Sequence, residues 1–321
     1  MTALRFAVFG KSKLAATRCH AIAEHGGTQI ARTWASDEVE RFSPADWNGA
    51  LDPKSVDAAI FALPAGLAAE GSLRALHSGI HVLSELPGGR TVEDIINLRE
   101  AERASRAVLK FGCGLRYHES VRAACELAED GVYGRLLTAR AVYGHAGFPS
   151  EEAAEHGILP AHGIHMLDLL HIFCGPFEAV KAMNSGAMGG EDTNVFALLR
   201  TGGGTIAQLH SSATSWRQTF RLELGFEEGY IWLDGHLPGL QGYGPEMLIH
   251  ARMSRDAEGR PRANPDETVR EFRTARTANE ELCEFVDAMA GRAPVRQGTS
   301  HQAFDAMNIA QRICAATETW A

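Results

Sequence analysis

The stretch LRFAVFGKSKLAA, residues 4–16, decides the fold of the first part of the chain. Residues 4–9 have the length and the aromatic and β-branched content of a buried strand, and they lead directly into Gly10. A helical pattern follows through Ala23. Backbone N–H groups at the start of such a helix can hold a pyrophosphate. The stretch predicts a dinucleotide-binding loop, with an ordinary strand-to-helix turn as the alternative.

The loop departs from the common G-x-G-x-x-G pattern. Gly10 supplies the first glycine, whereas Ser12 stands at the second position and Ala15 at the third. Ser12 adds a Cβ atom where the backbone should approach the phosphates, but its hydroxyl can contact them, with Lys11 nearby. We therefore expect a cofactor loop formed by Gly10, Ser12, Lys13 and Leu14.

Alternating strand and helix patterns continue to residue 112. The predicted strands cover residues 29–34, 56–64, 81–84 and 108–112, and the predicted helices cover residues 67–77 and 92–105. Repeated βα units with short connections predict a parallel, doubly wound sheet of the Rossmann type with right-handed crossovers. Ligands bind such sheets at the carboxyl ends of the strands. The residues at these ends are Gly10, Pro64, Glu85, Leu86, Pro87 and Gly112.

The pattern changes after residue 118. A predicted helix, 120–129, is followed by strand patterns at 136–143, 195–200, 205–211, 220–226 and 230–233, and by closing helices at 279–290 and 301–316. Strands that follow one another through short turns predict an antiparallel sheet. We expect residues 1–118 to form a dinucleotide-binding Rossmann domain, and residues 119–321 to form an α+β domain with a large, mostly antiparallel sheet for substrate binding and oligomerisation.

Composition limits the classes of partner. The 321 residues carry a formal net charge of −9, which argues against a nucleic-acid or anionic membrane surface and favours a small-molecule substrate. The start of the chain lacks the long apolar run of a signal peptide or membrane span, so we expect a cytoplasmic protein. The six cysteines form no C-x-x-C pair, and we expect reduced thiols and no metal site.

Four runs of sequence resemble one known family. They are GIHVLSELPGG (79–89), FGCGLRYHESV (111–121), GILPAHGIHMLDLL (157–170) and EDTNVFALL (191–199). In this order they resemble the glucose-fructose oxidoreductase, inositol dehydrogenase and rhizopine-catabolism (Gfo/Idh/MocA) family, over nearly the whole chain. The resemblance implies a Rossmann domain that binds NAD or NADP and a second domain whose sheet forms the substrate floor and often an oligomer interface. It also implies hydride transfer between a sugar or cyclitol C–OH and the nicotinamide.

The resemblance assigns site residues, with several departures. Glu85 and Pro87 match the family's Glu-Lys-Pro motif, but Leu86 replaces the lysine. His165 matches the family histidine and is the predicted catalytic residue, although the aspartate four positions earlier is Ala161. Arg116 matches a residue near the nicotinamide. Leucine can only pack, and loss of a positioned acid-base group costs about 100- to 10,000-fold in rate.

Other side chains are further candidates for the site. Lys110 is a weak substitute for the missing lysine, and Asp168 shares a helical face with His165. Asp37 can bind the adenosine ribose and favours NAD, whereas Arg32 and Ser36 favour NADP. A further set can meet a sugar ring: Tyr143, His145, Trp216, Arg217 and Tyr243. His162 and His165 are close enough for joint metal ligation, but without a further set of ligands no metal is expected.

Three functions fit this sequence. The first is an NAD(P)-dependent oxidoreductase acting on a sugar, sugar nucleotide or cyclitol, with an unusual site; imine reduction is a variant of it. The second is a redox-inactive family member that acts as a ligand-binding, regulatory or partner subunit. The third uses the cofactor for elimination or epimerisation. Apolar side chains alternate along residues 220–226 and need a cover. We expect the domain's own helices to provide part of it and another subunit the rest, which predicts a homodimer or homotetramer.

Overall fold

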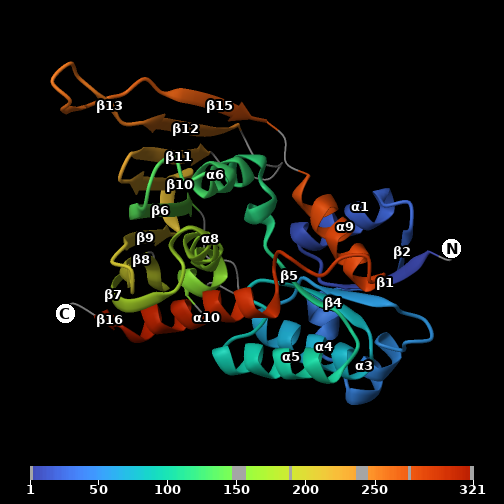
Figure 1. Cartoon of the computed structure of the whole chain (residues 1–321). Helices are drawn as coiled ribbons and strands as arrows, with labels where there is room; N and C mark the ends of the chain where they lie inside the picture. Colours follow the sequence, from blue (N-terminus) through green and yellow to red (C-terminus); the bar gives the residue numbers. More distant parts are fainter. Residues whose placement is uncertain (1–2, 147–156, 188–189, 236–244, 274–275, 319–321) are drawn as a thin grey trace. The chain divides into compact units, whose positions relative to one another are not determined.

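The chain divides into two units, each with its own sheet (Figure 1). The computed structural model describes residues 3–146, 157–187, 190–235, 245–273 and 276–318. Unit 1 consists of residues 1–114 and 276–308, and unit 2 of residues 115–275 and 309–321. This differs from the predicted division, in which the second domain ran from 119 to 321.

Unit 1 contains a five-stranded parallel sheet in the order β2-β1-β3-β4-β5. Its strands are β1 (Leu4–Phe9), β2 (Thr28–Trp34), β3 (Ala58–Phe61), β4 (His81–Glu85) and β5 (Leu109–Gly112). Its helices are α1 (Lys13–Glu24), α2 (Ser36–Val39), α3 (Pro44–Ala50), α4 (Ala65–His77), α5 (Val92–Ala104) and α9 (Thr277–Met289). The predicted doubly wound parallel sheet is confirmed.

Helices cover both faces of this sheet, as a parallel sheet requires. Figure 1 shows α1 and α9 on one face and α3, α4 and α5 on the other. Helix α9 belongs to this unit because Leu282 and Phe285 join the core formed by Phe6, Val8 and Ile22. This packing brings residues from the far end of the chain to the first sheet, which the order of elements along the sequence did not reveal.

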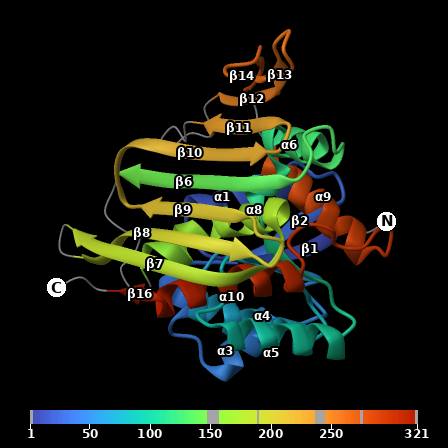
Figure 2. The same ribbon diagram turned by 60° about the vertical axis from the view of Figure 1, so that its left-hand side comes forward.

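Unit 2 contains a nine-stranded sheet in the order β15-β12-β11-β10-β6-β9-β8-β7-β16 (Figure 2). Its strands are β6 (Leu136–Ala146), β7 (Phe177–Ala187), β8 (Gly190–Thr201), β9 (Ile206–Ser212), β10 (Thr214–Phe226), β11 (Gly229–Gly235), β12 (Glu246–Arg252), β15 (Thr268–Phe272) and β16 (Thr317–Glu318). The pairs β6/β9 and β7/β16 are parallel, and the other pairs are antiparallel. The predicted large, mostly antiparallel sheet is confirmed.

One face of this sheet is covered by α6 (Glu119–Glu129) and α8 (Ile164–Cys174). The remaining elements are the 3-10 turn η1 (Gly114–Tyr117), the π-helix η2 (Leu159–Gly163), the small hairpin β13 (Ser254–Arg255) and β14 (Pro261–Arg262), and α10 (Ser300–Ala315). Phe220, Leu222 and Leu224 are buried in the core beneath the covering helices, together with Met166 and Leu170. These strand residues therefore need no second subunit to cover them, contrary to the reason given for the predicted oligomer.

Among the described residues, no helix has both the length and the apolar character needed to cross a membrane.

Candidate functional site

The predicted cofactor loop lies at the carboxyl end of β1. Gly10 has φ +126°, and a Cβ atom there would lie 2.2 Å from the carbonyl oxygen of Ala62, just beyond β3. Only glycine permits both this backbone conformation and this approach. Ser12 is the N-cap of α1, and its Oγ atom accepts a hydrogen bond from the Ala15 N–H at 3.2 Å. The loop thus has the predicted glycine turn and helix start, and Ser12 caps this helix, a role that the sequence did not predict.

The next two predicted cofactor residues follow that cap. Lys13 opens α1, and Leu14 is 43% exposed although it is large and apolar. Pro64, at the end of β3, is the residue from which α4 begins. The structure therefore places all of these residues at the carboxyl edge of the sheet in unit 1, where dinucleotides bind in this class of fold.

The end of β2 is aromatic rather than acidic. Trp34 stacks on Phe9 with ring centroids 4.7 Å apart. Asp37 lies in the first turn of α2, and its carboxylate is 3.5 Å from the exposed guanidinium of Arg41. The neighbouring acid, Glu38, accepts the Ala35 N–H at 2.6 Å and so caps the helix. Asp37 forms an exposed, weak ion pair with Arg41. Its contact with the ribose stays a prediction.

Leu86 has the packing role expected of leucine. It follows Glu85 at the end of β4, is 7% exposed, and is joined to Pro87 by a cis peptide bond. Lys110, the weak substitute, is fully buried, and its Nζ atom donates hydrogen bonds to Glu284 and to the Gln297 carbonyl. Its ammonium group therefore binds residues in and after α9.

Glu85 is held by an arginine that the sequence reasoning did not single out. The Nε and Nη2 atoms of Arg18 donate to the two carboxylate oxygens of Glu85 at 2.6 and 3.0 Å. Arg18 Nη2 also lies 2.6 Å from Glu281 of α9. A sequence signal existed, because Arg18 falls at helical spacing between the buried residues Ala15 and Ala21 and so points into the core.

In unit 2, Arg116 and Asp168 form a buried ion pair. Arg116 donates from Nε and Nη2 to the two carboxylate oxygens of Asp168, both at 2.6 Å. The side chains are only 6% and 3% exposed. Both oxygens of Asp168 therefore accept from Arg116, which gives the pair a structural role on η1 and α8. The predicted contact of Arg116 with the cofactor stays a prediction.

Three histidines gather near the start of α8. His165 lies in its first turn, His162 in the preceding π-helix η2, and His145 near the end of β6. The rings of His145 and His162 are 4.4 Å apart between centroids and nearly perpendicular. Burial, with smaller contributions from His145 and His165, lowers the pKa of His162 to about 3, and burial also lowers the pKa of His145. Both rings are thus neutral at pH 7.

Several buried polar atoms in this part of unit 2, as the structure describes it, have no hydrogen-bond partner. Within the described residues, the Nε2 atoms of His145 and His162, Ser211 Oγ and Gln218 Oε1 have no hydrogen-bond partner. Ser211 lies beside the π-helix, since a Cβ atom on Gly163 would be 2.9 Å from its hydroxyl. Gln218 lies in β10 where the register opposite Gly144 and Ala146 is irregular. Unpaired buried polar atoms are costly, so this region suits a ligand rich in hydroxyl groups.

Ser211 and Gln218 were missed by the sequence reasoning, because serine and glutamine within strand patterns carry no distinctive signal. His145 was named there among residues able to meet a sugar ring. Of the others, Trp216 is 83% exposed, and Tyr243 lies outside the described residues. Among the described residues, no three His, Cys, Asp or Glu side chains come together in a way that could hold a metal ion.

Comparisons with known proteins identify relatives of unit 2 and of the whole fold. Residues 121–232 match the model of the GFO/IDH/MocA C-terminal domain. The chain is 34% identical over 187 residues to 1,5-anhydro-D-fructose reductase of Ensifer adhaerens, covering 55% of each protein. It is 27% identical over 165 residues to levoglucosan dehydrogenase of Pseudarthrobacter phenanthrenivorans, covering 47% of this chain and 42% of that protein. The chain thus spans about half the length of the curated relatives it matches.

Solved structures show the same fold over the full length. A levoglucosan dehydrogenase complexed with NADH and L-sorbose has a TM-score of 0.79 at 19% identity, covering 98% of this chain and 97% of that one. The open form of a 3-ketoreductase from Actinomadura kijaniata, complexed with TDP-benzene and NADP, has a TM-score of 0.80 at 19% identity, covering 99% and 98%. Likeness at this identity shows the two-unit fold.

Proposed function

Because residues 121–232 match the GFO/IDH/MocA C-terminal domain and solved structures share the two-unit fold, we propose that the chain is a member of the Gfo/Idh/MocA family and an NAD(P)-dependent oxidoreductase. We propose that it acts on a hydroxyl group of a sugar, sugar nucleotide or cyclitol. The observation that carries this proposal is the group of buried, unpartnered polar atoms beside His165. A ligand with several hydroxyl groups satisfies such atoms, because each hydroxyl both donates and accepts.

The residues of unit 1 fit a dinucleotide. Gly10, Ser12, Lys13 and Leu14 would hold the pyrophosphate at the start of α1, and Asp37 would meet the adenosine ribose. Pro64, Glu85, Leu86 and Pro87 would line the nicotinamide half at the ends of β3 and β4, and Arg116 is kept as a further candidate. A bound nicotinamide would supply the hydride acceptor, or the hydride in the reverse direction.

His165 is the proposed proton acceptor. As the hydride leaves the substrate carbon, the hydroxyl on that carbon loses its proton to the imidazole and a carbonyl forms; reduction reverses both transfers. Imidazole suits this role because it titrates near neutral pH. His162 and His145 stay neutral and would hydrogen-bond neighbouring hydroxyl groups, because charging them at their buried positions is unfavourable.

A second candidate function follows from Leu86. This side chain is buried and nonpolar where the family motif has a lysine, and Ala161 replaces the family aspartate. A protein without these groups could bind the same ligands and not turn them over. We keep a redox-inactive ligand-binding, regulatory or partner subunit as the alternative.

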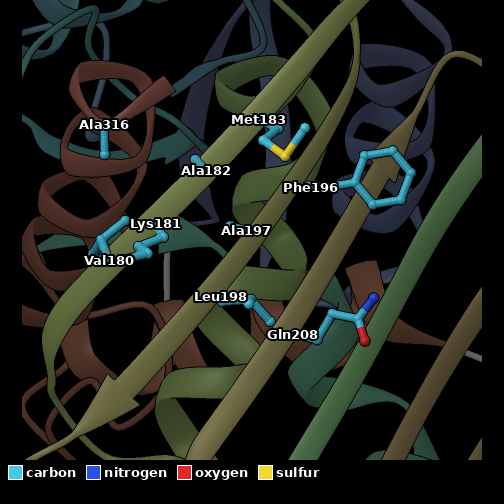
Figure 3. Close-up of a pocket in the computed structure, with 9 residues that line it drawn as sticks. All are labelled: Val180, Lys181, Ala182, Met183, Phe196, Ala197, Leu198, Gln208 and Ala316. Carbon is cyan, nitrogen blue, oxygen red and sulfur yellow. The ribbon is translucent and has the colours of Figure 1, made fainter. Parts of the chain in front are cut away.

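We also propose a homo-oligomer. The buried residues of β10 do not support it, but the exposed apolar residues on the other face of the sheet do. The uncovered face of the unit 2 sheet exposes large apolar side chains, with Leu198 54%, Ile206 50% and Phe196 44% exposed. A hollow of about 680 Å³ lies on this sheet, and Figure 3 shows Met183, Phe196 and Leu198 among the residues that line it. Large apolar side chains exposed together on one sheet face favour a second subunit. We propose the cytoplasm as the place of action.

Calorimetric titration with NAD, NADH, NADP and NADPH tests the proposal first. Micromolar binding of one pair is the expected result and identifies the cofactor. A sugar screen with that cofactor follows, beginning with levoglucosan and 1,5-anhydro-D-fructose, and absorbance at 340 nm is the standard signal for the reduced nicotinamide. A folded protein that binds none of the four dinucleotides would refute the oxidoreductase. Binding without turnover across the screen would favour the redox-inactive alternative.

A further inference from the structure

The Arg18, Glu85 and Glu281 side chains form a buried charge cluster in unit 1. Arg18 is 3% exposed, Glu281 1% and Glu85 11% by side chain. Each of the four carboxylate oxygens has an N–H partner. Both oxygens of Glu85 accept hydrogen bonds from Arg18. One oxygen of Glu281 pairs with Arg18 Nη2, and the other accepts the Cys113 N–H at 2.6 Å. Both carboxylates are therefore placed as anions. One cation between two anions leaves the cluster with a net charge of −1.

The cluster is charged and links several elements of unit 1. It joins α1, the end of β4, the end of β5 and α9. A Cβ atom on Gly112 would lie 2.1 Å from Glu85 Oε2 and 2.8 Å from Arg18 Nη2, so glycine is needed for this approach. Burial alone would lower the pKa of Arg18, but the carboxylates of Glu281 and Glu85 outweigh burial and raise it. Arg18 therefore stays protonated.

The location of the cluster matters for a dinucleotide. In a doubly wound sheet the two halves of the ligand lie on either side of the switch point, which here falls between β1 and β3. The glycine loop of β1 would receive the pyrophosphate, and the nicotinamide half would then lie at the ends of β3, β4 and β5. Glu85 and Cys113 are at two of those ends. With Leu86 beside Glu85, no lysine at this motif position offsets the negative charge.

We infer that the cluster of Arg18, Glu85 and Glu281 makes the cofactor site favour the oxidised dinucleotide over the reduced one, an inference that rests on the proposed dinucleotide function. The oxidised nicotinamide ring carries a positive charge and the reduced ring carries none. A fixed negative charge near the ring, shielded from water, stabilises only the charged form. Glu281 thus contributes its negative charge to the electrostatic field at the ring. It is also a positioning residue, because it holds Arg18, which binds Glu85.

The substitution Glu281→Gln tests this, because it removes one charge and nearly preserves the shape of the side chain. Calorimetry gives the ratio of the dissociation constant of the oxidised form to that of the reduced form. We expect Glu281→Gln to raise this ratio about three- to tenfold. Glu284→Gln is the matched control, since Glu284 is also on α9 and pairs with buried Lys110. That variant loses the same charge, but its partner Lys110 lies three residues before Cys113 in the sequence. Its ratio of the two dissociation constants is expected to stay within about twofold of the wild-type ratio.

Each result separates this inference from the proposed function. Wild-type protein that binds neither form refutes the proposed function. The charge inference alone is overturned if the wild-type protein binds both forms but Glu281→Gln leaves the ratio of dissociation constants unchanged. It is also overturned if Glu284→Gln shifts this ratio as much as Glu281→Gln does. If Glu281→Gln does not fold, Glu85→Gln makes the same charge change from the strand side. Its ratio must then rise as well, and a ratio that stays constant or falls overturns the inference.

Discussion

Arg116 on η1 donates two hydrogen bonds of 2.6 Å to Asp168 on α8, and both side chains are buried. The pair links the turn that opens unit 2 to the helix that carries His165. Planar, two-point pairing of this kind fixes the orientation of both side chains. The stability of α8, and hence the placement of His165, therefore depends on this pair.

Asp168→Asn is expected to destabilise the protein strongly. It leaves the Arg116 guanidinium buried without its counterion, and breaking one side of a buried pair costs about 3–5 kcal/mol. Urea unfolding measures the change in the free energy of unfolding. Glu70→Gln in the exposed Arg74 pair on α4 is the control, with an expected change within about 1 kcal/mol. Equal effects of the two substitutions would contradict a special role for the buried pair.

His165→Asn is expected to lower kcat about 100- to 10,000-fold on a substrate found in the sugar screen, because asparagine cannot take up the hydroxyl proton. The dissociation constant of the cofactor is expected to stay unchanged. His171→Asn, further along α8, controls for loss of a histidine from the same helix. A His165→Asn enzyme that keeps its kcat would remove His165 from the chemistry.

Leu86→Lys combined with Ala161→Asp is expected to raise kcat for sugar oxidation by at least about tenfold. The lysine restores the cation of the Glu-Lys-Pro motif, and the aspartate restores the acid four residues before His165. Leu86→Met with Ala161→Asn is the control, because it changes size and polarity without the two charges. If the charged variant folds and binds cofactor but turns over no faster than this control, the departures at these positions are not what limits the rate.

Acid is expected to destabilise the protein through His162. Its pKa is lowered to about 3 in the folded protein, below the ordinary value of 6.5, because the ring is buried. Between these values the unfolded chain binds more protons, so stability falls as pH falls below about 6.5. From pH 7.5 to 5.5 this group accounts for about 1.4 kcal/mol.

Urea unfolding of His162→Gln at the two pH values measures that contribution. The variant is expected to lose about 1.4 kcal/mol less than wild type over this interval. His20→Gln, which changes an exposed histidine of α1, is expected to follow wild type. A His162→Gln protein with the same pH dependence as wild type would show that the ring is not kept neutral.

Leu198→Glu is expected to dissociate the proposed oligomer. The side chain lies on the uncovered face of β8, where a charge would be buried between subunits. Light scattering at micromolar concentration measures the mass, and Leu14→Glu, at an exposed apolar residue of unit 1, is the control. A wild-type protein that is already monomeric would contradict the proposal.

The structure bore out the sequence expectation for the two sheets. The alternation of apolar strands and helices up to residue 112 predicted unit 1, because a parallel sheet requires helical crossovers between successive strands. The sequence patterns also predicted the large second sheet, but not its strands β7, β12 and β15, nor the parallel pair β6 and β9. Register and partner choice depend on packing across the whole sheet, which a local pattern does not contain.

The sequence by itself determined the alternating strands and helices of unit 1, five strands of the second sheet and the positions of the motif residues, since strand and helix periodicity and glycine turns are local properties. Only the tertiary structure decided which distant side chains meet. It brought α9 to α1, so that Glu281 reaches Arg18, which also binds Glu85, and it placed Ser211 beside Gly163. Such contacts arise because apolar faces far apart in the chain are buried together. Charged groups next to these faces then pair with one another, and no local sequence pattern specifies these pairs.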